Sequence, residues 1–254
     1  MTDFRLLQTG HKSAAFNMAL DEVLVNRVRS GQSKPSLRLY GWQPAAVSIG
    51  YFQSLEVEVD TKRCEELNID VVRRQTGGGA VFHDDEVTYS MHIPLELGLV
   101  PVKVLDSYSR ICQGIIKGLA PLDIEAQFVP LNDIIANGKK ISGNAQTRKQ
   151  GVLLQHGTIL TGVDVDKMFD LLKVPDEKMK GKLISSIKER VTSIAQLTGT
   201  EVVYQDIVDT LVAGFKEEFS EINFVEDEMT AEEIDETEKL ATNKYGAHDW
   251  NYQR

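Results

Sequence analysis

The chain has 254 residues, of which 42% are hydrophobic and 26% are charged. These shares are close to the average of globular proteins and exclude a wholly disordered chain. At roughly 150 residues per domain the length predicts one or two domains, with a core that needs neither disulfides nor a structural metal. The two cysteines, Cys64 and Cys112, exclude a disulfide framework and a cysteine-rich zinc module.

The net charge of −10 is unevenly distributed. Residues 221–254 hold ten acidic and three basic residues, which gives −7 there and leaves −3 for the first 220 residues. Because nucleic-acid-binding proteins normally carry a basic excess, we expect no nucleic-acid partner. The sequence begins without an apolar signal segment and has no apolar stretch of about 18 residues, so we expect a cytoplasmic protein with no membrane partner.

The first predicted element is an amphipathic helix at residues 14–29, whose apolar residues recur at helical spacing until Gly31. Short apolar runs at 37–40 and 46–51 predict two strands, joined by a turn around Pro44. The following elements are a short helix at 60–67, a strand at 69–74, a loop at 76–79, a strand at 87–93 and a helix at 105–119.

Asn137-Gly138 gives the strongest hairpin signal, with apolar runs on both sides. A strand at 152–160 follows, and then helices at 164–172, 205–219 and 230–244. Strands that neighbour one another without regular strand–helix alternation favour an α+β fold. We expect a single domain over 1–254, with a motif core at about 31–220 and an acidic tail, 221–254, that forms either a small cap or, as we favour, a solvated helix.

Three consecutive glycines, Gly77 to Gly79, follow a strand that ends in Arg73 and Arg74. Glycines let the backbone approach a ligand closely and turn N–H groups toward an anion. Arginines at the strand end can bind phosphate or carboxylate in a bidentate manner. The alternative is a glycine-rich hairpin with solvated arginines, and the loop matches neither a Walker A sequence nor a dinucleotide-binding fingerprint.

Lys140 directly follows the predicted hairpin turn and precedes the small residues Ser142, Gly143 and Ala145. This pattern is compatible with a lysine along a cavity wall, although most lysines near a turn are solvated. His156 lies within a predicted strand, where a hydrogen-bonded core histidine is more common than a catalytic base. The chain contains neither a G-x-S-x-G nor an H-E-x-x-H sequence, and both cysteines are interpreted as structural.

Taken in order, these segments resemble the lipoate-protein ligase A family of the biotin/lipoate protein ligase superfamily. The matching segments are residues 73–84, 132–133, 140–145, 156–158, 174–178 and 249–251. The resemblance covers nearly the whole chain. It implies the α+β catalytic-domain fold of that superfamily, a curved mixed β-sheet flanked by helices.

The resemblance also implies two half-reactions. Lipoate attacks the α-phosphorus of ATP with the help of Mg²⁺ to form lipoyl-AMP, and a lysine of a lipoyl-domain acceptor then takes the lipoyl group. Lys140 would be the catalytic residue, since both steps need positive charge where negative charge develops. The residues implied to bind ATP, lipoate or lipoyl-AMP are Arg74, Gly77, Gly78, Gly79, Ala80, Val81, Phe82, His83, Asn132, Asp133, Lys140, Gly143 and His156. Asp133 is also a candidate Mg²⁺ ligand, and Val81, Phe82 and Ile141 are candidates for lining an acyl tunnel.

We expect the chain to lack the C-terminal accessory domain of full-length bacterial ligases, so the resemblance implies a two-component form with a separate small accessory subunit for adenylation. The implied acceptors are E2 subunits of 2-oxoacid dehydrogenases or the glycine cleavage H protein. A binding or scaffold subunit without catalysis is a third interpretation, which the combination of Lys140 with the glycine loop disfavours.

The alternative enzyme is an octanoyltransferase that moves octanoate from acyl carrier protein to a lipoyl domain. Such enzymes share the domain and the lysine but use a cysteine nucleophile, in one branch a short distance before the lysine. Residues 123–129 contain no cysteine, and Cys112 precedes Lys140 by 28 residues. Residues 83–90 and 146–148 nevertheless resemble that branch.

Overall fold

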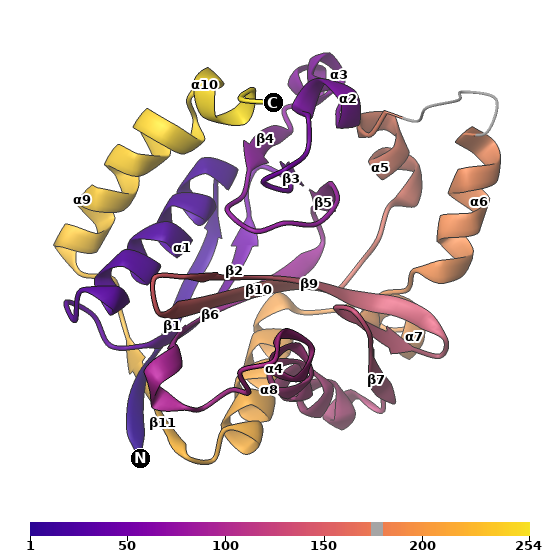
Figure 1. The fold of residues 1–254 in the computed structure, drawn as a ribbon. Coiled ribbons are helices and arrows are strands. Elements are labelled where there is room, and N and C mark those ends of the chain that lie inside the picture. Colours follow the sequence, from indigo (N-terminus) through magenta and orange to yellow (C-terminus); the bar gives the residue numbers. More distant parts are fainter. Residues whose placement is uncertain (174–179) are drawn as a thin grey trace.

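The computed structural model describes residues 1–173 and 180–254 and centres on an eight-stranded mixed sheet of order β11-β1-β2-β6-β10-β9-β8-β7 (Figure 1). Its strands are β1 (Thr2–Lys12), β2 (Ser36–Trp42), β6 (Glu86–Pro94), β7 (Ala126–Val129), β8 (Asp133–Ala136), β9 (Lys139–Lys149), β10 (Val152–Leu160) and β11 (Ile222–Asp227). Strand β1 runs parallel to both of its neighbours, whereas the remaining pairs are antiparallel.

A second sheet of order β4-β3-β5 lies over part of the large one (Figure 1). Its strands are β3 (Ala46–Ile49), β4 (Asp70–Arg73) and β5 (Val81–His83). The helices are α1 (Ala14–Arg29), α2 (Leu55–Glu58), α3 (Thr61–Glu66), α4 (Val104–Leu119), α5 (Val165–Leu171), α6 (Lys180–Arg190), α7 (Ile194–Thr198), α8 (Tyr204–Glu218), α9 (Ala231–Leu240) and α10 (His248–Asn251). Short turns of other helix types within the described residues are η1 (Leu95–Leu97), η2 (Ala120–Leu122) and η4 (Ala241–Tyr245).

Helices α4 and α8 cover one face of the large sheet and enclose the main core (Figure 1). Tyr89 of β6, Ile115 of α4 and Phe215 of α8 are all fully buried in this core. The two helices approach so closely that a methyl group at Gly214 would lie 2.2 Å from the backbone nitrogen of Gly118. Glycine at this crossing therefore lets the two helix backbones touch.

The α+β class predicted from the sequence is confirmed, with a large mixed sheet flanked by helices. The acidic segment after residue 221 differs from the solvated helix that was expected. Its first part is β11, which pairs with β1, and α9 packs against α1. The reason is charge pairing: Glu233 is buried and accepts a hydrogen bond from Arg5 at 3.0 Å, and Asp227 accepts one from Arg5 at 2.7 Å. The family-like segment 174–178 lies outside the described residues.

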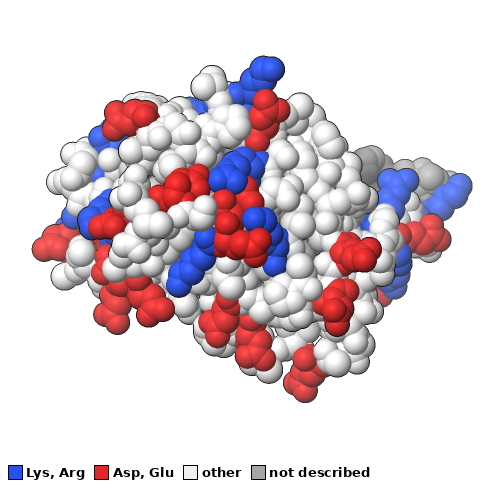
Figure 2. Space-filling model, turned by 90° about the horizontal axis from the view of Figure 1, so that it is seen from below, with Lys and Arg blue, Asp and Glu red and all other residues white. Residues whose placement is uncertain are grey.

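The face that carries α4 and α8 mixes acidic and basic side chains (Figure 2). Arg110 and Lys117 of α4 pair there with Glu218 of α8, and Arg110 also pairs with Glu221. In the part of the chain that the structure describes, no helix is long and apolar enough to cross a membrane.

Candidate active site

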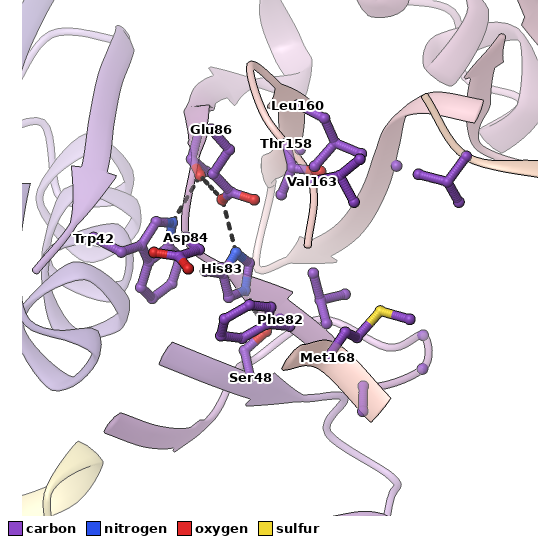
Figure 3. A pocket seen from close by; sticks show the side chains of 18 of the residues that line it. Trp42, Ser48, Phe82, His83, Asp84, Glu86, Thr158, Leu160, Val163 and Met168 are labelled. Atoms are coloured by element: carbon purple, nitrogen blue, oxygen red, sulfur yellow. Dashed lines mark hydrogen bonds and ion pairs between the residues drawn. The ribbon is translucent and has the colours of Figure 1, made fainter. Parts of the chain in front are cut away.

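A cavity of about 510 Å³ lies between the small sheet and strands β9 and β10, with α5 along one side. This volume is within the range of about 300–1,000 Å³ that is typical of small-molecule sites. Figure 3 shows polar side chains, Trp42, His83 and Glu86, opposite the apolar side chains of Leu160, Val163 and Met168. The cavity therefore combines an apolar wall with a small number of polar groups.

Of the thirteen residues expected to bind ligands, all but Gly77 and Asp133 line this cavity. Val81 and Phe82 line it as expected for an acyl tunnel, whereas Ile141 is fully buried in the main core and does not. The structure thus brings together segments that are far apart in the sequence, and the role of each residue stays a prediction.

Arg73 is buried beneath the cavity by the C-terminal segment. Its guanidinium donates to the carbonyl oxygens of Gln53 at 2.6 Å and of Asn251 at 2.7 Å, and its backbone N–H donates to Asn251 Oδ1 at 2.7 Å. Trp250 Nε1 in turn donates to the carbonyl of Arg73 at 2.9 Å. Arg73 therefore anchors α10 to β4 and does not line the cavity.

Arg74 lines the cavity and shapes the glycine loop from inside. It donates to the carbonyl oxygens of Gly77 and Gly79, both at 2.8 Å, and to Ser48 Oγ at 3.1 Å. Burial lowers the pKa of Arg74 to about 10. These hydrogen bonds from the guanidinium stabilise the turn at Gly78, where φ is 100°.

Gly50 supports this loop from below. A methyl group at Gly50 would lie 2.0 Å from the carbonyl oxygen of Gly78, which is a backbone atom that cannot rotate away. We expect Gly50→Ala to lower stability by about 1–3 kcal/mol through overpacking and to displace the loop from the cavity. Thermal unfolding measures the first effect and ligand binding the second. In Gly77→Ala the added methyl group meets nothing within 4 Å, so an equal loss of stability there would contradict this explanation.

Lys140 extends along the wall of the cavity from β9. Its Nζ lies 2.8 Å from Asp133 Oδ1, and its backbone carbonyl accepts a hydrogen bond from Thr192 N at 2.8 Å. A methyl group at Gly143 would lie 2.9 Å from Lys140 Nζ, so glycine at that position makes room for the lysine side chain. Glycine at 143 is therefore compatible with the position of the Lys140 side chain along the cavity wall.

Asn144, which the sequence alone did not single out, links β9 to β6 and to the turn before β8. Its Oδ1 accepts from the Tyr89 hydroxyl at 2.8 Å, and its Nδ2 donates to the carbonyl of Asn132 at 3.0 Å. Asn132 Nδ2 donates back to the carbonyl of Asn144. A methyl group at Gly157 would lie 2.1 Å from Asn144 Oδ1, which explains the glycine after His156.

Asp133 was expected to be a candidate Mg²⁺ ligand. In the structure its carboxylate forms an ion pair with Lys140. Among residues 1–173 and 180–254, no group of three or more His, Cys, Asp and Glu side chains is placed to hold a metal. The role of Asp133 toward Mg²⁺ stays a prediction.

His156 is buried, and both of its ring nitrogens are engaged. Nδ1 lies 3.0 Å from Asp21 Oδ2 and Nε2 lies 2.7 Å from Thr76 Oγ1. Asp21 also accepts from Arg38 at 3.0 Å and from Ser90 at 2.9 Å. This network joins α1, β2, β6 and β10 beneath the glycine loop, which is the hydrogen-bonded core role that the sequence favoured.

The charge state of this network is set by burial and by its partners. Burial alone would raise the pKa of Asp21, but the hydrogen bond from His156 and the charge of Arg38 lower it to about 2. Burial lowers the pKa of the neighbouring His92 to about 4, against the attraction of Asp21. The folded protein therefore keeps Asp21 ionised and His92 neutral at pH 7.

These two pKa values predict a loss of stability in acid. As the pH falls below 6.5, His92 becomes protonated in the unfolded chain but stays neutral in the folded chain until about pH 4. The free energy of unfolding therefore decreases as the pH falls from 6.5 to about 4. The stability contributed by Asp21 is then lost as the pH falls from 3.8 toward 2. Urea unfolding at pH 7 and at pH 4.5 gives the free energy of unfolding at both ends of the first window. The difference between the two values should be smaller in His92→Gln than in the wild type. His248 is exposed, so His248→Gln should leave this difference unchanged. A decrease in the difference as large as that in His92→Gln would contradict the role given to His92.

A second polar chain lies on the cavity wall itself. Ser48 Oγ of β3 is 2.7 Å from His83 Nε2, and His83 Nδ1 is 2.8 Å from Glu86 Oε1. The His83 ring stacks on Trp42 with the ring centres 3.9 Å apart (Figure 3). His83 was expected at the site, but Ser48 and Glu86 were not, because no local sequence signal links a serine to a histidine 35 residues later.

The two cysteines are buried and lie away from the cavity lining. Burial raises the pKa of Cys64 to about 11 and that of Cys112 to about 12. Both thiols are therefore protonated at neutral pH, which makes them poor nucleophiles.

Comparisons with known proteins identify the family of this chain. Residues 13–216 match the family model of the lipoyl protein ligase A/B catalytic domain. The chain is 34% identical to octanoyltransferase LipM of Staphylococcus epidermidis, over 99% of both chains. It is 37% identical to octanoyltransferase LipM of Kyrpidia tusciae, over 100% of both chains. The fold is similar to that of a bipartite lipoate protein ligase from Thermoplasma acidophilum, at 31% identity and a TM-score of 0.89, with 99% of this chain and 97% of that chain covered.

The expectation of an ATP-dependent lipoate-protein ligase is corrected by these relatives. Curated relatives that match over nearly their full length, at 32–37% identity, are octanoyltransferases, and this agrees with the alternative rather than with the ligase. The motifs did not separate the two reactions for a physical reason. Both reactions need positive charge beside an acyl carbonyl while a lysine amine attacks it, so both keep the lysine strand and the glycine loop.

Proposed function

The chain belongs to the lipoyl protein ligase A/B catalytic-domain family, and from this premise we propose that it is an octanoyltransferase. It takes an octanoyl group from the thioester of an acyl carrier protein and transfers it to a lysine of a lipoyl domain. The observation that carries the proposal is the near full-length similarity to octanoyltransferases. The described site supports it, because the cavity offers an apolar wall for an acyl chain and a lysine beside it.

In the proposed site the acyl chain lies against Val81, Phe82 and Met168, and the thioester carbonyl lies near Lys140 Nζ. The positive charge of Lys140 stabilises the negative charge that develops on the carbonyl oxygen during acyl transfer. Asp133 holds the ammonium group at 2.8 Å and orients it toward the cavity.

A thioester is already activated, so the proposed reaction needs neither ATP nor Mg²⁺. The separate accessory subunit expected for adenylation has no step to serve in this reaction. A lipoyl domain is proposed as the acceptor because the structurally similar ligase from Thermoplasma acidophilum is described together with its E2 lipoyl domain.

The proposal is tested by incubating the purified chain with octanoyl–acyl carrier protein and a lipoyl domain in the absence of nucleotide. We expect one octanoyl group on the acceptor lysine, detected by intact-mass measurement. Product that forms only from free octanoate with ATP, and never from the thioester, would overturn the proposal. A lipoyl domain with its acceptor lysine changed to arginine is the matched control.

The apolar wall predicts selectivity for acyl length. Each buried methylene contributes about 0.8 kcal/mol, so kcat/KM should fall about fourfold for each methylene removed from the donor. A hexanoyl thioester should therefore react roughly 15-fold less efficiently than the octanoyl thioester. Equal kcat/KM for acyl groups from butanoyl to octanoyl would show that the chain does not enter the cavity.

A further inference from the structure

Acyl transfer from a thioester through a covalent intermediate requires a nucleophile in the cavity. Cys64 and Cys112 do not line the cavity and are 1% and 0% exposed. The cavity wall instead contains Ser48, His83 and Glu86, joined by hydrogen bonds of 2.7 and 2.8 Å in the order serine, histidine, carboxylate. This is the order and spacing in which a hydroxyl group is activated by a general base and an orienting carboxylate.

Resting on the proposed function, we propose that Ser48 is the acyl-accepting nucleophile of this enzyme, with His83 as its general base and Glu86 as the residue that positions His83. The three side chains come from β3, β5 and the start of β6 and face one cavity (Figure 3).

The surrounding donors fix the direction of the hydrogen bonds. Arg74 Nη1 lies 3.1 Å from Ser48 Oγ, and a guanidinium can only donate. The Glu86 carboxylate can only accept, so His83 carries its ring proton on Nδ1 and donates it to Glu86. In the neutral ring, Nε2 is then the acceptor for the Ser48 hydroxyl at 2.7 Å. This tautomer is the one that a general base needs, and the charge of Arg74 stabilises negative charge on Ser48 Oγ.

The transfer balances in two steps. Ser48 Oγ attacks the thioester carbonyl while His83 takes its proton; the carbon–sulfur bond breaks, and the thiolate leaves with that proton as a thiol. The acceptor amine then attacks the Ser48 ester, a carbon–nitrogen bond forms, and the carbon–oxygen bond to serine breaks. The proton from the amine returns to Ser48 Oγ through His83, so no oxidant, reductant or nucleotide is consumed.

Ser48, His83 and Glu86 are 1%, 5% and 2% exposed, so all three are held within the protein at the cavity wall. Glu86 Oε1 also accepts from Thr88 at 2.6 Å, whereas Glu86 Oε2 is buried and has no hydrogen-bond partner within the described part of the chain. A buried carboxylate oxygen without a partner on the wall of a cavity is suited to a donor from a bound ligand.

The experiment traps the acyl-enzyme on the full chain with octanoyl–acyl carrier protein. Acid quenching and peptide mapping should place one octanoyl group on Ser48, as an oxygen ester that resists neutral hydroxylamine. Ser48→Ala should lose this adduct and lower transfer at least about 100-fold. Ser48→Cys should carry a thioester at the same position, which neutral hydroxylamine releases.

The matched control is Ser36→Ala. Ser36 Oγ lies 3.0 Å from His92 Nδ1, which is the same type of buried pair, but neither residue lines the cavity. This variant should keep the Ser48 adduct. Octanoyl transfer by the wild type without a Ser48 adduct, or transfer by folded Ser48→Ala at the wild-type rate, would overturn the nucleophile while leaving the proposed function intact. A Ser48 adduct without transfer to the lipoyl domain would support Ser48 as the nucleophile and contradict the lipoyl domain as the acceptor. If neither the adduct nor the transfer is detected, both the nucleophile and the proposed function are contradicted.

Discussion

Replacement of Lys140 by alanine is expected to lower octanoyl transfer about 100- to 1,000-fold, the usual cost of removing one group that stabilises an oxyanion. The fold should persist, because the side chains of Lys140 and its partner Asp133 are 41% and 35% exposed. The measurement is the initial rate of transfer together with thermal unfolding of the variant.

Lys139→Ala is the control, since Lys139 neighbours Lys140 on β9 but does not line the cavity. It removes the same charge from the same strand and should transfer at close to the wild-type rate. Near-normal transfer by folded Lys140→Ala, or an equal loss in both variants, would contradict the assignment.

The largest effect on stability is expected for Asp21→Asn. The side chains of Asp21 and Arg38 are 2% and 0% exposed, so loss of the carboxylate leaves the guanidinium buried without its counter-charge. Removal of one partner of a buried pair costs about 3–5 kcal/mol. Urea unfolding at pH 7 measures this loss, which should be accompanied by disordering of the His156 contact to Thr76.

Asp227→Asn provides the comparison. Asp227 also pairs with an arginine, Arg5, but it is 49% exposed and Arg5 keeps a second partner in Glu233. An exposed pair contributes about 0–1 kcal/mol, so this variant should be nearly as stable as the wild type. Similar losses in the two variants would show that burial does not set the strength of the Asp21 network.

Local signals predicted much of the fold. The expected hairpin is present because Asn137 and Gly138 both have positive φ, 48° and 74°, as a two-residue turn between β8 and β9 requires. The helix at 14–29 was predicted with its observed bounds, because its apolar face and its N-cap lie within one segment.

Pairings between distant segments were not predictable from local pattern. The β1–β11 pair joins residues about 220 positions apart, and Arg73 bonds to Asn251 178 positions later. Ser48 likewise meets His83 only because β3 and β5 are neighbours in the small sheet. The sequence located the cavity through its glycines and Lys140, but its motifs are shared by two reactions, and the activity was assigned wrongly for that reason.

The most direct test of the proposed activity lets both donors compete in one reaction. Octanoyl–acyl carrier protein with one isotopic label and free octanoate with another are mixed with ATP, Mg²⁺, the purified chain and a lipoyl domain, and the label on the acceptor lysine is read by mass spectrometry. If the chain is an octanoyltransferase, the acceptor lysine should carry the label of the thioester. The amount of this labelled product should stay the same when ATP is removed enzymatically. Product that carries the label of free octanoate and disappears with ATP would contradict it.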